Sequence, residues 1–218
     1  MKPYDTILFD LDGTLTESSL GITNSVAYAL RKMGHPVPSR EALHIFIGPP
    51  LSETFTKCCG MTPEEATQAI ACYREYYHDR GIFENAVYEG IEPLLKKLRD
   101  AGKTLILATS KPEEVSIQIL DHFGLSQYFT HIAGATMDDT RSKKSDVIAY
   151  ALKGCQPADL RRTVMVGDRH HDIDGAKHFG MKSIGVTYGF GSAEELQNAG
   201  ADYIVHSPRE VADLILNK

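Results

Sequence analysis

Long apolar segments are missing from this sequence of 218 residues. A helix that spans a bilayer needs about 18 or more consecutive apolar residues, and no such run occurs. The first residues lead directly into a short strand-like segment, without the charged leader and apolar stretch of a signal peptide. We therefore expect neither a membrane span nor secretion, and we expect the protein in the cytoplasm.

Positive charge is also scarce. The chain has 23 Lys and Arg against 29 Asp and Glu, a formal net charge of −6, and no long run of basic residues. Proteins that bind nucleic acid through its backbone usually carry a basic patch or stripe. We expect no nucleic-acid polymer among the partners.

Cysteine is sparse and lacks the spacing of a metal or redox motif. The four cysteines include no Cys-x-x-Cys pair, so reduced thiols are expected rather than a disulfide framework or a zinc site. The cysteines are Cys58, Cys59, Cys72 and Cys155.

Two carboxylates stand where the first predicted strand ends. Residues 6–9 form a short apolar run, typical of a strand buried on both faces, and the heptad Phe-Asp-Leu-Asp-Gly-Thr-Leu follows at 9–15. In a parallel α/β sheet, ligands bind outside the carboxyl ends of the strands. Asp10 and Asp12 are therefore candidate ligands of a cation. An EF-hand starting at Asp10 would need Glu at its twelfth position, where the chain has Gly21.

The apolar periodicity divides the chain into two patterns. From 16 to 87 it predicts helices at 20–33, 40–46, 51–59 and 63–80, the last capped by Thr62 and Glu65. From Tyr88 onward helices and strands alternate, which predicts a doubly wound parallel α/β sheet. The expected strands after residues 6–9 are 104–109, 131–134, 163–166, 182–186 and 203–205, and the expected helices are 92–101, 113–123, 145–152, 172–179, 193–199 and 208–216.

The heptad resembles the first signature of the haloacid dehalogenase (HAD) superfamily of phosphotransferases. The resemblance implies that Asp10 is the nucleophile that attacks phosphorus and that Asp12 is the general acid and base. Dehalogenating members lack the second acid, so Asp12 favours phosphoryl transfer.

Two further stretches resemble the phosphate-binding positions of that family. The sequence Thr-Ser-Lys-Pro at 109–112 implies that Thr109, with Ser110 beside it, holds phosphoryl oxygens; without the resemblance, an ordinary N-cap for the helix that begins at Glu113 would be the favoured interpretation. The resemblance also implies that one lysine of an adjacent pair offsets the negative charge of the phosphate, although a surface lysine pair taken alone is usually just solvated. In relatives with a similar Arg-x-x-Lys-x-acid-Val-Ile stretch, the lysine two residues before the acid is the functional one, which selects Lys144, with Lys143 as the fallback.

A Gly-Asp pair at 167–168, with a second acid at Asp172, resembles the family's metal-binding stretch. It implies that Asp168 binds Mg²⁺ together with the Asp10 side chain and the backbone carbonyl of Asp12, an all-oxygen set that suits Mg²⁺. Asp172 is expected to orient a water of the metal or Lys144. His170 and His171 could bind zinc, but lack a third nitrogen or sulfur ligand nearby and are expected on the rim.

The resemblance extends to the phosphoglycolate-phosphatase-like and 5′-nucleotidase-like subgroup. It implies a Rossmann-like catalytic core at 1–15 and 88–218 and a small all-helical cap at 16–87. In that subgroup a turn like Gly48-Pro49-Pro50 faces the active site from the cap, so we expect the residues that read the substrate's leaving group near this turn; the same turn could also be a plain corner between helices.

Two other phosphate-binding patterns are rejected. Cys155 and Arg161 have the Cys-x5-Arg spacing of cysteine-dependent phosphatases, but the interval has no glycine and contains Pro157 and Asp159. No Walker-type loop occurs, and the glycines from Gly185 to Gly191 predict only a turn.

The expected activity is a Mg²⁺-dependent phosphomonoester hydrolase that forms an aspartyl phosphate and acts on a small metabolite of the phosphoglycolate or nucleoside 5′-monophosphate type. A phosphomutase, or an inactive module that binds a phosphorylated ligand, are the alternatives. The sequence does not predict the oligomeric state.

Overall fold

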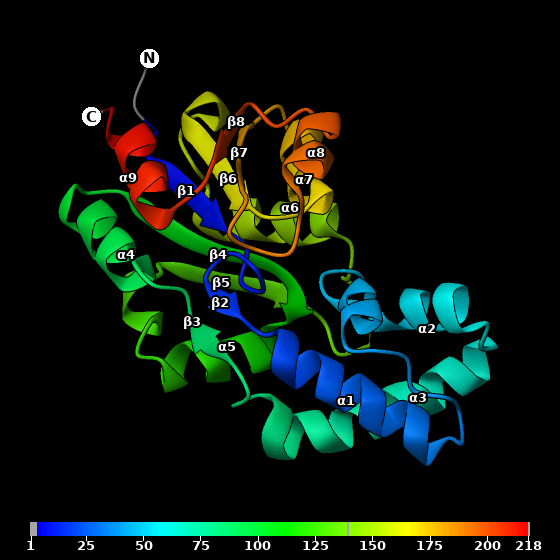
Figure 1. Cartoon of the computed structure of the whole chain (residues 1–218). Coiled ribbons are helices and arrows are strands. Elements are labelled where there is room, and N and C mark those ends of the chain that lie inside the picture. Colours follow the sequence, from blue (N-terminus) through cyan, green and yellow to red (C-terminus); the bar gives the residue numbers. More distant parts are fainter. Residues whose placement is uncertain (1–3, 139, 218) are drawn as a thin grey trace. The chain divides into compact units, whose positions relative to one another are not determined.

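The computed structural model describes residues 4–138 and 140–217, which divide into two compact units (Figure 1). One unit combines Met1–Thr16 with Val87–Lys218, and the other is Glu17–Ala86. Two-residue strands, β2 (Thr16–Glu17) and β3 (Ala86–Val87), pair where the chain passes from one unit to the other and back. Each unit is described by itself below.

The larger unit is built on a six-stranded parallel sheet with the order β5-β4-β1-β6-β7-β8. The chain builds outward from β1 through β4 and β5, then crosses to the other side of β1 for β6, β7 and β8. The strand order therefore reverses at β1, and the crevice at such a switch point is where ligands bind. The bounds are β1 Thr6–Phe9, β4 Thr104–Pro112, β5 His131–Ala135, β6 Thr163–Gly167, β7 Lys182–Val186 and β8 Tyr203–Val205.

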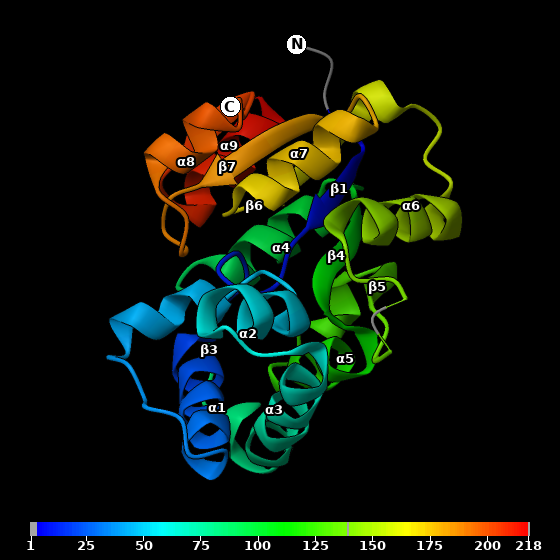
Figure 2. The same ribbon diagram turned by 90° about the vertical axis from the view of Figure 1, so that its right-hand side faces the viewer.

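Helices cover both faces of this sheet (Figures 1 and 2). On one face α6 and α7 pack side by side over a fully buried core that includes Leu8, Ile106 and Met165. On the other, α4 packs against α9. The bounds are α4 Ile91–Asp100, α5 Glu113–His122, α6 Lys144–Cys155, α7 His170–His178, α8 Ala193–Asn198 and α9 Pro208–Leu216. Burial on both faces explains why β1 reads as a continuous apolar run, and the predicted fold class is confirmed.

The smaller unit is helical. Its α1 (Ser19–Lys32) packs against α3 (Pro63–Tyr76), and the 3-10 helix Glu41–Phe46 and α2 (Leu51–Cys59) lie between them in sequence. The predicted capping box of α3 is present: the Thr62 hydroxyl accepts from the Glu65 amide at 3.2 Å, and the Glu65 carboxylate accepts from the Thr62 amide at 2.8 Å. Gly48 has a φ of 103°, so the turn before α2 depends on a glycine.

Several details differ from the sequence prediction. Within the helix predicted at 40–46, Glu41–Phe46 form a 3-10 helix, and the α-helix expected at 63–80 ends at Tyr76 and is followed by a π-helical turn, Tyr77–Gly81. Over only one or two turns, the spacing of apolar residues does not distinguish an α-helix from a 3-10 or π-helix. Strand β4 runs to Pro112 instead of ending at Thr109, and β2 and β3 are too short to give a periodic signal. Within the described ranges, no helix combines the length and apolarity needed to cross a membrane.

Candidate active site

Asp10 and Asp12 leave β1 through a tight turn that brings both carboxylates to the carboxyl edge of the sheet. The Asp10 amide donates to the Val166 carbonyl at 3.0 Å, which extends the pairing with β6 by one residue. Gly13 then adopts a φ of 81°. A Cβ at Gly13 would also lie 2.2 Å from Asp168 Oδ2, so both conformation and space require glycine there.

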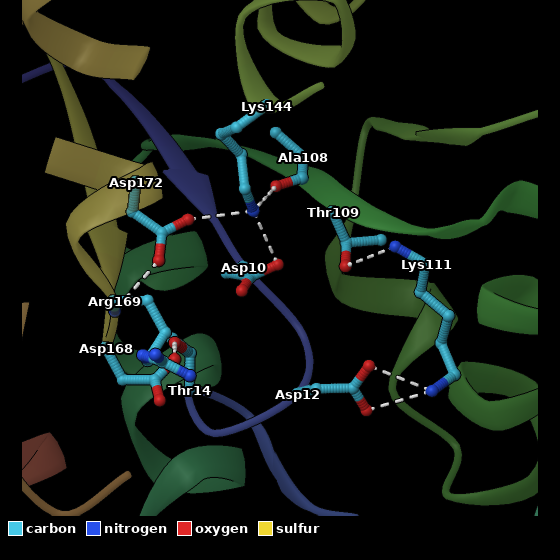
Figure 3. Close-up of polar contacts among 10 residues, drawn as sticks. All are labelled: Asp10, Asp12, Thr14, Ala108, Thr109, Lys111, Lys144, Asp168, Arg169 and Asp172. Atoms are coloured by element: carbon cyan, nitrogen blue, oxygen red, sulfur yellow. Dashed lines mark hydrogen bonds and ion pairs between the residues drawn. The ribbon is translucent and has the colours of Figure 1, made fainter. Parts of the chain in front are cut away.

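Three buried carboxylates meet beside this turn: Asp10, Asp168 and Asp172 each offer an oxygen within 4.8 Å of the others (Figure 3). Burial raises the pKa of Asp10 to about 6 although Lys144 opposes the rise, and the negative charge of Asp172 adds to it. Burial, with the negative charges of Asp172 and Asp10, raises the pKa of Asp168 to about 8. The cluster therefore holds more negative charge than its surroundings neutralise, and its oxygen ligands fit a divalent cation such as Mg²⁺.

Lys144, the first residue of α6, extends into this cluster. Its ammonium lies 2.8 Å from Asp10 Oδ1 and 2.8 Å from Asp172 Oδ1, and it donates to the Ala108 carbonyl at 3.1 Å. Burial opposes the charged form, but the two carboxylates outweigh it and raise the pKa of Lys144. Lys143, the fallback, is exposed. The structure thus brings Lys144, and not Lys143, to Asp10.

Thr109 lies inside β4, the strand that pairs directly with β1. Its side chain is buried, and its hydroxyl accepts a hydrogen bond from the Lys111 amide at 3.2 Å. Ser110 is half-buried. Helix α5 has Pro112 at its N-cap and no side-chain cap, so the alternative role of these hydroxyls as helix caps is wrong. Their role in holding phosphoryl oxygens stays a prediction.

Asp168 follows β6, and its carboxylate is fixed at both oxygens. Oδ1 accepts from the Thr14 hydroxyl at 3.2 Å and Oδ2 accepts from the Phe190 amide at 2.8 Å. Thr14 is fully buried. The heptad therefore contributes an orienting hydroxyl that the sequence analysis did not single out.

The loop after β7 was expected to be a simple turn, but its backbone also packs against the site. A Cβ at Gly189 would lie 2.1 Å from the Gly13 carbonyl oxygen, and one at Gly191 would lie 1.8 Å from the Asp168 carbonyl oxygen. Both glycines allow the loop to approach the site with its backbone. The sequence signal for this close approach was the pair of glycines on either side of Phe190, shortly after β7.

Asp172 lies in the first turn of α7 and is fully buried. One oxygen pairs with Lys144, and Oδ2 accepts from the Arg169 amide at 3.2 Å. Asp172 therefore contacts Lys144, and its role in orienting this lysine stays a prediction. The His170 ring contacts the His171 ring at a tilt of 41° and pairs through Nδ1 with Glu195 Oε1 at 2.8 Å, which gives the histidine pair a structural partner outside the carboxylate cluster.

A second lysine reaches the site from β4. The Lys111 ammonium donates to both oxygens of Asp12, at 3.0 and 2.9 Å, and both side chains are nearly buried (Figure 3). Lys111 belongs to the Thr-Ser-Lys-Pro stretch, but the sequence predicted no role for it. The sequence signal for a role at the site was its position, two residues after Thr109 at the end of a predicted strand.

The cysteine-phosphatase pattern has no phosphate cradle in the structure. The Cys155 thiol, with its pKa raised by burial, donates to the Leu152 carbonyl at the end of α6. Arg161 is exposed and pairs with Asp159 at 3.0 Å. The guanidinium that would bind phosphate is thus occupied by an anion of the same loop.

Comparison with known proteins assigns this geometry to a family. The model of the haloacid dehalogenase-like hydrolases matches residues 7–186. This chain belongs to that family. A crystal structure of a predicted phosphatase from Clostridium acetobutylicum matches this HAD-like chain with a TM-score of 0.96 at 48% identity, covering 100% of both chains.

Two curated relatives resemble this HAD-like hydrolase over most of its length. A 5′-nucleotidase of Pseudomonas aeruginosa is 42% identical over 194 residues, which cover 89% of this chain and 87% of the relative. The tyrosine-protein kinase PtkA of Mycobacterium tuberculosis is 43% identical over 201 residues, which cover 92% of this chain and 68% of that protein. With the family match and the site together, the chain is a phosphatase of the HAD-like class.

Without a divalent cation, the stability of this HAD-like protein should fall as pH rises from about 5 to about 8. The folded state holds the Asp168 proton up to a pKa of about 8, whereas the ordinary value is 3.8. The folded state therefore binds more protons than the unfolded state in this interval, so stability present at low pH is lost as pH rises, by roughly 2–4 kcal/mol. Urea unfolding in EDTA at several pH values measures the slope.

The control for this measurement is Asp168→Asn, which keeps the shape and removes the charge. It should flatten most of the slope, and added Mg²⁺ should stabilise the parent protein more at pH 8 than at pH 5. A metal-free stability that rises over this interval would contradict the charge excess of the cluster.

Proposed function

We propose that this chain is a Mg²⁺-dependent phosphomonoester hydrolase that acts on a small phosphorylated metabolite through an aspartyl phosphate on Asp10. The observation that carries the proposal is the Lys144 ammonium at 2.8 Å from both Asp10 and Asp172, in a buried cluster that also contains Asp168. A nucleophilic carboxylate, its countercharge and a set of cation ligands thus share one site. Asp10, Asp168 and the Asp12 carbonyl would hold Mg²⁺, which supplies charge neutralisation at the transferring phosphoryl group.

In the first half-reaction, an Asp10 carboxylate oxygen forms a bond to phosphorus as the bond from phosphorus to the leaving oxygen breaks. Lys144 and the Thr109 hydroxyl, with Ser110 beside it, would stabilise the charge on the phosphoryl oxygens. Asp12 gives its proton to the leaving alkoxide, which departs as an alcohol.

In the second half-reaction, Asp12 accepts a proton from water as the water oxygen bonds to phosphorus. The bond from phosphorus to Asp10 breaks, inorganic phosphate leaves, and Asp12 is again protonated for the next cycle. One carboxyl group thus serves as acid and then as base.

The proposed substrate is a small phosphomonoester, with phosphoglycolate and nucleoside 5′-monophosphates as the leading candidates. The 5′-nucleotidase relative supports the second class, and the relative named a tyrosine-protein kinase makes phosphotyrosine worth testing. As the subgroup resemblance implies, residues 16–87 are proposed as a cap whose turn Gly48-Pro49-Pro50 reads the leaving group. A cytoplasmic location also stays a prediction.

Phosphate release from a panel of small phosphomonoesters tests this function. We expect release of inorganic phosphate in Mg²⁺ from at least one candidate, and loss of nearly all of it, about 100-fold or more, in excess EDTA. Restored Mg²⁺ should restore the rate. A phosphomutase would instead yield an isomeric sugar phosphate without free phosphate, and an inactive binding module would bind a substrate without turnover; either result contradicts the proposal.

A further inference from the structure

Lys111 forms an ion pair with Asp12 beside the carboxylate cluster. Its ammonium lies 3.0 Å from Asp12 Oδ1 and 2.9 Å from Asp12 Oδ2, so one cation spans both oxygens of the carboxylate (Figure 3). The Lys111 side chain is 7% exposed and that of Asp12 is 12% exposed. Exposed ion pairs contribute little because water screens them, but this pair is largely shielded from water.

The fold explains how two residues 99 positions apart meet. Strands β1 and β4 are parallel neighbours, with Phe9 opposite Leu107, so both chains leave the sheet at the same edge. Asp12 lies in the turn after β1, while Lys111 extends from the last residues of β4 beyond Thr109. The pair therefore connects the turn that carries both catalytic carboxylates to the strand that carries the predicted phosphate-binding hydroxyls.

Each carboxylate of the heptad has its own lysine. Lys144 contacts Asp10 through one oxygen and also contacts Asp172. Lys111 instead contacts both oxygens of Asp12, which restricts rotation of the carboxylate about its last side-chain bond. The two lysines therefore differ: Lys144 neutralises charge at Asp10, whereas Lys111 restrains the orientation of Asp12.

We propose that Lys111 is a positioning residue that holds the Asp12 carboxyl group in line with the leaving oxygen of the substrate. The inference rests on the proposed role of Asp12 as general acid and base. Proton transfer requires the two oxygen atoms to lie within about 3 Å of each other, and a misplacement of about 1 Å costs on the order of 100-fold in rate. Lys111 acts through Asp12 and does not itself exchange a proton with the substrate.

The inference predicts a dependence on the leaving group that a loss of packing would not produce. An alkoxide is a poor leaving group and needs the proton that Asp12 delivers. The p-nitrophenolate anion is stable and leaves without one. A displaced Asp12 should therefore slow the release of an alcohol from an alkyl phosphate far more than the release of p-nitrophenol from its phosphate.

The test compares Lys111→Met with Lys111→Arg under single-turnover conditions in Mg²⁺, with glycerol phosphate and p-nitrophenyl phosphate as substrates. Release of the leaving group is followed so that only the first half-reaction counts. We expect Lys111→Met to lower the saturated rate on glycerol phosphate by about 10- to 100-fold and on p-nitrophenyl phosphate by less than about 3-fold. The enzyme concentration that gives half the maximal rate should change little.

Lys111→Arg should recover much of the rate on glycerol phosphate because a guanidinium pairs with both carboxylate oxygens. Lys153→Met, at an exposed lysine of α6, controls for the loss of one positive charge. Thermal unfolding of each variant shows whether it folds. If Lys111→Met does not fold, Lys111→Arg decides: a rate on glycerol phosphate near that of the parent supports positioning, and an equal loss on both substrates overturns it.

Three outcomes overturn the inference. An equal loss on both substrates would make Lys111 a structural residue. A change confined to the half-saturating concentration would make it a contact of the substrate, and no change would leave the contact without a role. Asp12→Asn is the benchmark, because if it shows no dependence on the leaving group, the proposed role of Asp12 fails rather than the role of Lys111 alone.

Discussion

Asp10→Asn should reduce phosphate release by at least about a thousandfold while the protein stays folded. The side chains have nearly the same shape, but an amide oxygen is a far weaker nucleophile than a carboxylate. The fold should tolerate the exchange, because the pKa of Asp10 is raised to about 6 mainly by burial, and the neutral amide avoids that cost. Steady-state phosphate release in Mg²⁺ measures the loss, and thermal unfolding measures the fold.

The decisive comparison for this variant is Asp10→Asn against Asp12→Asn. Both remove one charge from the same turn, but only the first removes the nucleophile. Asp12→Asn should still form the aspartyl phosphate from p-nitrophenyl phosphate, whereas Asp10→Asn should not. An Asp10→Asn variant that keeps most of the parental rate would mean that another group attacks phosphorus.

Lys144→Met should lower activity by about a thousandfold or more, and Lys143→Met should leave it within about twofold. Lys144 is buried 2.8 Å from Asp10 and Asp172, whereas Lys143 is exposed. Without Lys144, Asp10 and Asp172 lose a shared countercharge. The transferring phosphoryl group also loses a cation. Phosphate release by the two variants side by side measures the difference.

Lys144→Met should also destabilise the metal-free protein, by about 3–5 kcal/mol, because removing one partner of a buried ion pair leaves uncompensated charge. Added Mg²⁺ should recover part of this stability, so the activity comparison belongs at saturating Mg²⁺. Equal losses in Lys143→Met and Lys144→Met, or a larger loss in Lys143→Met, would contradict the placement of Lys144 at the site.

Most of the fold could be predicted from local sequence patterns. The strands at 6–9, 182–186 and 203–205 and the helix at 208–216 begin and end where their apolar patterns predict. These strands are short apolar runs bounded by turn residues, so local pattern and tertiary burial agree. The π-helical turn at Tyr77–Gly81 and the paired β2 and β3 were not predicted because each covers only about one period of its pattern, too little to show a repeat.

Site residues that belong to a sequence motif could be predicted. Contacts that depend on how distant loops pack could not. Asp10, Lys144 and Asp168 follow from motif resemblance, and the structure gathers them. The contacts of Thr14 and Phe190 with Asp168 depend on how distant loops pack, which no local pattern encodes. Lys111 was visible in the sequence, but its partner became apparent only when β4 was placed beside β1.

The most direct measurement of the central claim is the location of the covalent phosphoryl group. The protein is mixed with substrate and Mg²⁺, quenched rapidly in acid during turnover, digested, and analysed by peptide mass spectrometry. A phosphoryl group on Asp10 that disappears as turnover ends is the predicted result. A phosphoryl group on another residue, or its absence from Asp10 in an Asp12→Asn variant that still releases p-nitrophenol, would contradict the account.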